Sequence, residues 1–231
     1  MKNPRPTTPS TPPATATRTR PGALLLAATG ILFVLYPALR PWEDESTLAG
    51  AIAALGSTAW VASHLFAMIG FILLPLGLLA LRRAVAGTPG ERPAVAGLLT
   101  AWIGAGLVLP YYGAEDFGLN AIAREAAEGQ RFDLLAVVET VRFSPVAATT
   151  FGIGLLALAV GAVLAGVAVW RSGTLTRYSG IPFALGFALF LPQFFTPAPV
   201  RITHGVLVGI GSAWLARELW RTETRQPAQL S

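Results

Sequence analysis

Two histidines and two adjacent carboxylic acids lie in or beside apolar stretches and are the residues best suited to chemistry. His64 lies in TAWVASHLFAMIG, His204 lies in PVRITHGVLVG, and Glu115 and Asp116 follow LVLPYYGA. Polar side chains are costly inside a membrane, so those that occur there are candidates for function. At 1.5 Å per helical residue, the His64 and His204 imidazoles lie roughly 10 Å and roughly 8 Å from the nearer ends of their helices. The distribution of charge predicts that these two ends face the same side of the membrane. We therefore expect the two imidazoles at a similar depth.

These residue types are typical of general acid–base catalysis. Glu115 or Asp116 would donate a proton, and a histidine, His64 or His204, would accept it. Three further polar residues stand near the same ends of their stretches and are expected to line the same pocket, namely Tyr112, Gln193 and Arg201. The sequence thus predicts an outward-facing polar pocket.

Two other interpretations of the histidines stay open. His64 and His204 could be the axial ligands of a b-type haem, or bind a metal together with one carboxylate. Each imidazole could instead be neutral and bonded to a neighbouring carbonyl or hydroxyl group, such as that of Ser63 or Thr203. In the same way, Asp116 could cap a helix, and Arg201 could extend to a lipid phosphate. The sequence leaves the cofactor undetermined.

The composition requires a membrane environment for these residues. Of the 231 residues, 53% are hydrophobic and 13% are charged, against about 25% charged in an average soluble protein. Mean hydropathy is +0.58, and the chain has no cysteine. These values exclude a disordered protein and a disulfide scaffold, and they argue against an ordinary soluble enzyme. We expect an all-α integral membrane protein.

Six apolar stretches have about the length that a membrane-spanning helix requires, which is about 20 residues. Prolines lie near several of their ends. The sequence therefore predicts six transmembrane helices in a compact bundle, at residues 22–39, 59–81, 94–113, 146–170, 179–196 and 199–217.

The distribution of charge predicts the orientation of these helices. With the N-terminus inside, all but five of the 17 Lys and Arg residues are on the inside; the exceptions are Arg40, Arg124, Arg131, Arg142 and Arg201. All but three of the 12 Asp and Glu residues are outside; the exceptions are Glu91, Glu218 and Glu223. The dominance of Arg, Ala, Gly and Leu is typical of a GC-rich bacterial genome. We expect a multi-pass protein of the bacterial plasma (inner) membrane, with both termini cytoplasmic.

One long loop, 114–145, separates the third and fourth predicted spans. Apolar residues recur in it at helical spacing, and the pattern predicts two short amphipathic helices that lie on the outer membrane surface or cap the bundle. Their apolar faces would be formed by Ile122, Ala123, Ala126 and Ala127, and by Leu134, Leu135, Val138 and Val141. The predicted organisation is a disordered Pro/Thr-rich cytoplasmic tail (1–21), the membrane domain (22–220) and a short cytoplasmic tail (221–231).

These observations support one function and leave a second class open. An acid–base enzyme would act on a lipid or isoprenoid, and the chain is similar in size and composition to the small integral-membrane terpene cyclases, although no motif is shared. The alternative is a structural or accessory membrane protein. Membrane lipids are the expected partners. Nucleic acid is not, because the positive charges are scattered between apolar segments. No polar path crosses the spans, which argues against a transporter.

Overall fold

The computed structural model describes residues 18–225, so the predicted tail residues 1–17 and 226–231 lie outside the described part of the chain. Every regular element in the described part is helical. The helices are α1 (Arg20–Leu39), α2 (Leu48–Leu55), α3 (Thr58–Ala84), α4 (Glu91–Gly113), the π-helix η1 (Ala114–Gly118), α5 (Leu119–Ala127), α6 (Leu134–Phe143), α7 (Pro145–Ser172), α8 (Gly180–Ala188), the 3-10 helix η2 (Pro192–Phe195) and α9 (Ala198–Arg225).

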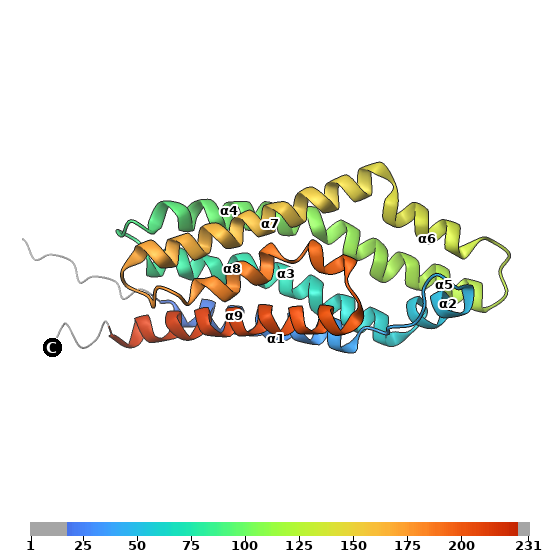
Figure 1. Cartoon of the computed structure of the whole chain (residues 1–231), viewed down its shortest axis with the longest axis horizontal. Helices are drawn as coiled ribbons and strands as arrows, with labels where there is room; N and C mark the ends of the chain where they lie inside the picture. Colours follow the sequence, from blue (N-terminus) through green and yellow to red (C-terminus); the bar gives the residue numbers. More distant parts are fainter. Residues whose placement is uncertain (1–17, 226–231) are drawn as a thin grey trace, which may run out of the picture.

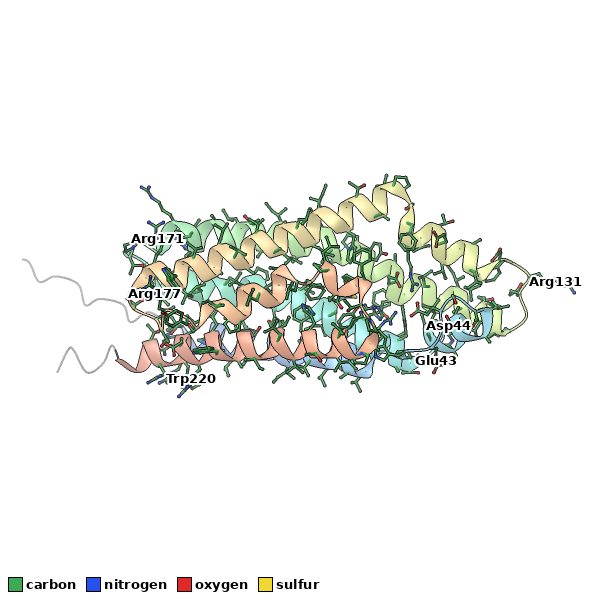
Figure 2. All side chains as sticks on the ribbon, in the orientation of Figure 1. Glu43, Asp44, Arg131, Arg171, Arg177 and Trp220 are labelled. Carbon is green, nitrogen blue, oxygen red and sulfur yellow. The ribbon has the colours of Figure 1, made fainter. Side chains whose placement is uncertain are left out.

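The helices of the bundle form a closed ring in chain order. α1 packs on α3, α3 on α4, α4 on α7, α7 on α8, α8 on α9, and α9 returns to α1. Figure 1 shows the result as an elongated bundle, with the C-terminal end of α9 at one end and α2, α5 and α6 at the other. Figure 2 shows the labelled Arg171, Arg177 and Trp220 at the first end, and Glu43, Asp44 and Arg131 at the second.

Four helical segments of the described chain are long and apolar enough to cross a membrane. They are Arg20–Leu39, Thr58–Ala84, Glu91–Ala127 and Pro145–Ser172, and they contain the first four predicted spans. α9 has 28 residues but is not among them. Residues 18–225 are thus all-helical in their regular structure, with four candidate spans.

The predicted fifth span, 179–196, is not one continuous helix, which corrects the expectation from its hydropathy. α8 has only nine residues and ends at Ala188, which makes it about 13 Å long. A turn and then η2 follow. Pro192 and Pro197 have no N–H group to donate to a preceding helical turn, so each disfavours continuation of the helix. The closed ring of helices therefore contains one short helix, α8.

The predicted third span is longer than expected. α4 continues through η1 into α5, so that residues 91–127 form a helical segment of 37 residues, about 55 Å in length. The hydrocarbon core of a bilayer is about 30 Å thick. A substantial part of this segment must therefore extend beyond the hydrocarbon core of any membrane that it crosses.

The segment beyond the bundle has a hydrophobic core of its own, which we call the cap core. It is formed by buried residues of α2, α5 and α6 with the first turn of α3, namely Ala51, Ala54, Leu55, Trp60, Leu119, Ala123, Leu134 and Val138. Ile122, Ala126, Leu135 and Val141 pack against it. The sequence analysis missed α2, because eight residues between two loops are too short for a clear periodic signal.

Helix α4 packs closely on α7 because glycines face each other. A Cβ atom on Gly97 would lie 2.8 Å from the carbonyl oxygen of Gly161, and one on Gly104 would lie 2.7 Å from that of Gly154. Small residues allow membrane helices to approach in this way. The close contact fixes α7 against α4, which matters because α7 forms one wall of the pocket described next.

The ends of the bundle differ slightly from the predicted boundaries. Thr19, expected in the N-terminal tail, is buried, and its hydroxyl donates to the carbonyl oxygen of Leu219 at 2.8 Å. The backbone N–H of Thr19 donates to the Glu223 carboxylate at 2.8 Å. The start of α1 is thus joined to the last turns of α9.

Candidate functional site

A pocket of about 390 Å³ lies at the end of the bundle remote from the C-terminal end of α9. This volume is within the range of about 300–1,000 Å³ that is usual for small-molecule sites. The pocket lies between the end of α1, the start of α3, the end of α4 with η1, the end of α6, the start of α7, η2 and α9. Its lining residues are Tyr36, Arg40, Trp60, His64, Tyr111, Tyr112, Glu115, Arg142, Phe143, Ala148, Phe151, Gly152, Leu191, Phe194, Phe195 and Arg201.

The short length of α8 explains where the pocket lies. α7 and α9 have 28 residues each, but α8 between them has nine. At this end of the bundle η2 therefore takes the place that a full-length helix would fill. Two large apolar side chains of the pocket lining are exposed: Phe143 is 63% exposed and Phe195 is 85% exposed. The pocket thus has an apolar rim.

His64 is held in the pocket by aromatic rings and by a backbone carbonyl group. Its ring centroid lies 4.2 Å from that of Trp60 and 5.8 Å from that of Tyr112. Nδ1 lies 2.9 Å from the carbonyl oxygen of Trp60. A carbonyl oxygen can only accept, so Nδ1 carries the hydrogen. In the neutral ring Nε2 is then an acceptor, and among the residues described no donor pairs with it.

Glu115 is fixed by two ion-paired hydrogen bonds. The Arg142 Nε and Nη2 atoms donate to its two carboxylate oxygens at 2.6 Å and 2.9 Å. Nη2 of Arg142 also lies 2.8 Å from the carboxylate of Glu45, which in turn pairs with Arg40. This chain of two arginines and two glutamates joins α6, η1 and the loop after α1. Glu115 is therefore engaged on both oxygens.

The charge of Arg142 is stabilised by this arrangement. Burial by itself lowers the pKa of the Arg142 guanidinium, but the carboxylates of Glu115 and Glu45 outweigh the effect of burial and hold that pKa above its ordinary value. Trp60 supports the same cluster, since its indole N–H donates to the backbone carbonyl oxygen of Glu115 at 2.9 Å.

Arg201, a predicted pocket residue, also lines the pocket but differs from the other two arginines. Its Nε donates to the side-chain oxygen of Gln193 at 3.0 Å. The guanidinium carbon lies 4.9 Å from the ring centroid of Trp42 and 5.0 Å from that of Phe194. No carboxylate of the described residues forms an ion pair with it. Gln193 itself is buried and is not one of the lining residues.

Asp116 and His204 are buried but lie outside the pocket lining. Both carboxylate oxygens of Asp116 lack a hydrogen-bond partner within the described part of the chain. Nε2 of His204 donates to the carbonyl oxygen of Gly186 at 2.7 Å. That carbonyl is unused by α8, because the last turn tightens and the Phe190 N–H bonds to Phe187 instead. The His204 side chain thus supplies the hydrogen bond that this carbonyl group at the end of α8 would otherwise lack.

The structure brings four of the seven predicted site residues into one pocket: His64, Tyr112, Glu115 and Arg201. The sequence analysis missed the ion-paired residues Arg40, Glu45 and Arg142. It counted each of them only as a charge on the outer side. The pairing could not be found from spacing, because Glu45 and Arg142 come from segments almost a hundred residues apart.

No group of three or more His, Asp or Glu side chains within residues 18–225 has a metal-binding arrangement. Only one of the two histidines lines the pocket. Comparison with known proteins yields no relative, since no protein-family model, no curated protein and no solved structure matches the chain. A functional proposal therefore depends on the geometry of the pocket.

Proposed function

We propose that this protein is a multi-pass membrane protein that binds a lipid or isoprenoid molecule in the pocket around His64. The observation that carries the proposal is the combination of an aromatic pocket of about 390 Å³ with an apolar, exposed rim formed by Phe143 and Phe195. A hydrophobic molecule could enter from the membrane between α7 and η2 without crossing water. Clefts of this size and lining bind small apolar ligands.

We further propose that the chain crosses the membrane six times, with the segment α8–η2 as the short fifth crossing and α9 as the sixth. The distribution of charge supports this topology. Arg171 and Arg177 lie at the end of the bundle where α9 ends, and Glu43 and Asp44 lie at the opposite end (Figure 2). Cytoplasmic segments are usually rich in Arg and Lys. Both termini would then be cytoplasmic, and the pocket would face the outer side of a bacterial plasma membrane, beneath α5 and α6.

His64 is the side chain in this pocket best placed for proton transfer, which favours acid–base chemistry on the bound lipid or isoprenoid. Its Nε2 has a free lone pair and the residue lines the pocket, whereas His204 lies outside the pocket lining. Glu115 has both oxygens bonded to Arg142, and Asp116 lies outside the lining. We therefore assign His64 as the base, with a donor supplied by the ligand itself or by Tyr112.

A pocket-filling substitution tests the binding proposal. A Cβ atom on Gly152 meets nothing within 4 Å, and this residue lines the pocket. Gly152→Leu should therefore place its side chain in the pocket without disturbing the backbone. We expect wild-type protein in phosphatidylcholine nanodiscs to bind dodecanol, measured by titration calorimetry, and Gly152→Leu to lose at least about tenfold in affinity, as the loss of a few buried methylene groups predicts.

The matched control is Gly106→Leu. Gly106 lies on the exposed face of α4, a Cβ atom there also meets nothing within 4 Å, and the residue is not part of the lining. This variant adds the same side chain to the membrane-facing surface, so its dodecanol affinity should equal that of the wild type. Equal affinities in all three proteins would mean that dodecanol only partitions into the bilayer, and the proposal would be wrong.

A further inference from the structure

Three arginines line the pocket, but the carboxylates beside them number only two. Glu45 pairs with Arg40 and Arg142, and Glu115 pairs with Arg142. Within the described chain, Arg201 has no carboxylate partner. The cluster therefore carries one uncompensated positive charge, and it is located on Arg201.

This positive charge is held in an apolar setting. The guanidinium carbon of Arg201 lies 4.9 Å from the ring centroid of Trp42 and 5.0 Å from that of Phe194. Its Nε is used by Gln193, and in the part of the chain that is described its terminal nitrogens have no hydrogen-bond acceptor. Arg201 is half-buried, and a charge that is partly withdrawn from water without a partner carries a cost. An anion at this position would remove that cost.

Tyr112 provides a second unused donor in the same pocket. Its side chain is buried, and its hydroxyl oxygen has no hydrogen-bond partner among residues 18–225. The ring of Tyr36 is close, with 5.8 Å between the two centroids. Even a contact between these two hydroxyl groups would use only one of their two hydrogens, so one phenol donor would remain for a ligand. A buried hydroxyl group without a partner is uncommon. The pocket therefore contains two kinds of donor that the chain itself does not satisfy, a guanidinium group and a phenol group.

We propose that the ligand of this pocket is an anionic amphiphile, with a phosphate or carboxylate head group bound by Arg201 and the Tyr112 hydroxyl. Its hydrocarbon tail packs on Phe151 and Phe194 and leaves the pocket past Phe195 into the membrane. The planar guanidinium group of arginine matches the oxygens of phosphates and carboxylates. This inference rests on the proposed function and specifies its ligand. A cationic head group is disfavoured, because both nearby carboxylates are already paired with arginine.

Amphiphiles with one tail and different head groups test the proposal. The wild-type protein is placed in nanodiscs of zwitterionic phosphatidylcholine and titrated with dodecyl phosphate, dodecanoate, dodecanol and dodecyltrimethylammonium. Gly152→Leu nanodiscs serve as the blank for partitioning. We expect dodecyl phosphate, dodecanoate or both to bind at least about tenfold more tightly than dodecanol, because hydrogen bonds to charged groups are the stronger ones. The comparison of the two anions distinguishes a phosphate from a carboxylate ligand.

The substitution Arg201→Gln should reduce the ratio of anion to dodecanol affinity to about one, and Arg201→Lys should retain part of it. The matched control is Arg177→Gln. Arg177 also stacks on an aromatic ring, at 3.7 Å from the Trp170 centroid, but it lies at the opposite end of the bundle. This control should keep the wild-type ratio.

Each remaining outcome has a distinct meaning. If dodecanol binds and the anions bind no better, the ligand is neutral and the present inference is wrong, while the binding proposal stands. If no compound binds wild type more tightly than Gly152→Leu, the binding proposal itself fails. If inorganic phosphate competes as well as dodecyl phosphate, the site binds a free anion and the assignment of an amphiphile is overturned.

Discussion

The two histidines differ in which ring nitrogen donates to a backbone carbonyl group. His64 uses Nδ1, toward Trp60, and His204 uses Nε2, toward Gly186. The bonded partner therefore decides which nitrogen is left as an acceptor. In His64 the remaining nitrogen belongs to a residue of the pocket lining, and in His204 it does not. The two histidines thus differ in their surroundings, although both are buried.

This difference predicts selective chemical modification. Diethyl pyrocarbonate reacts with an unprotonated imidazole nitrogen, so it should modify His64 in the folded protein faster than His204. Dodecanol at ten times its Kd should slow the reaction of His64 about tenfold, because the free pocket is then populated about one-tenth of the time. Mass spectrometry of the peptides that contain each histidine measures both rates.

The variant His64→Asn is the control for this experiment, because its amide nitrogen can still donate to the Trp60 carbonyl oxygen while the reactive nitrogen is absent. Modification of the protein should then be limited to the slow reaction of His204. Equal rates at the two histidines, unaffected by dodecanol, would contradict the assignment of His64 to the pocket.

At the scale of elements, the ion pairs of Arg142 join three separate segments: α6, η1 and the loop that follows α1. The hydroxyl of Tyr111 adds a fourth contact, since it donates to the carbonyl oxygen of Arg142 at 3.3 Å. The pocket-side end of α6 is thus held by charge, while its other face packs in the cap core through Leu134 and Val138. These two attachments position the end of α6 over the pocket.

Removal of this arginine should destabilise the protein strongly. Arg142→Ala leaves Glu115 buried without its partner, and breaking a buried ion pair in this way costs roughly 3–5 kcal/mol. The double variant Arg142→Met with Glu115→Gln removes both charges and should recover most of the loss. Thermal unfolding in mild detergent measures the change.

A comparison pair at the other end of the bundle is exposed. Arg20 and Glu223 approach to 3.9 Å, and the Arg20 side chain is 41% exposed. Arg20→Met should therefore lower the unfolding temperature much less than Arg142→Ala, because surface ion pairs contribute little to stability. A similar loss of stability for Arg20→Met and Arg142→Ala would mean that the ion pairs of Arg142 do not attach α6 to the bundle.

Local patterns predicted the elements better than they predicted the site. The apolar spacing in the loop 114–145 identified side chains that are buried in the cap core, such as Ala123 and Val138. The interruption after Ala188 was missed, because hydropathy does not distinguish a continuous helix from a broken one. Two contacts depend on the assembled helix bundle, namely that of His204 with Gly186 and that of Arg142 with Glu45. No single stretch of sequence predicts them.

At the scale of the whole molecule, the proposed orientation has its own test, because the chain has no cysteine and single cysteines can be introduced. Arg131 is exposed at the end of the molecule that contains the cap core. Thr174 is exposed in the loop between α7 and α8, at the other end. In intact bacterial cells, a membrane-impermeant maleimide should label Arg131→Cys. It should label Thr174→Cys only after the cells are permeabilised.

The opposite labelling pattern would reverse the orientation, and the pocket would then face the cytoplasm. Labelling of both variants in intact cells would mean that the two loops lie on the same side. Cysteine-free wild type is the blank in each case.

The cap core and the helix contacts of the bundle should respond differently to changes in the aqueous solvent. Burial from water stabilises apolar clusters, so the cap core, which in the proposed orientation lies beyond the bilayer, depends on the surrounding water. Helices within lipid gain no such stabilisation from each other and associate through close packing, as at Gly97 and Gly161. Urea weakens the hydrophobic stabilisation of buried apolar groups. Urea added from the aqueous side would therefore loosen α2, α5 and α6 around the cap core and leave the packing of the bundle helices unchanged. The entrance could open to water while the bundle stays assembled.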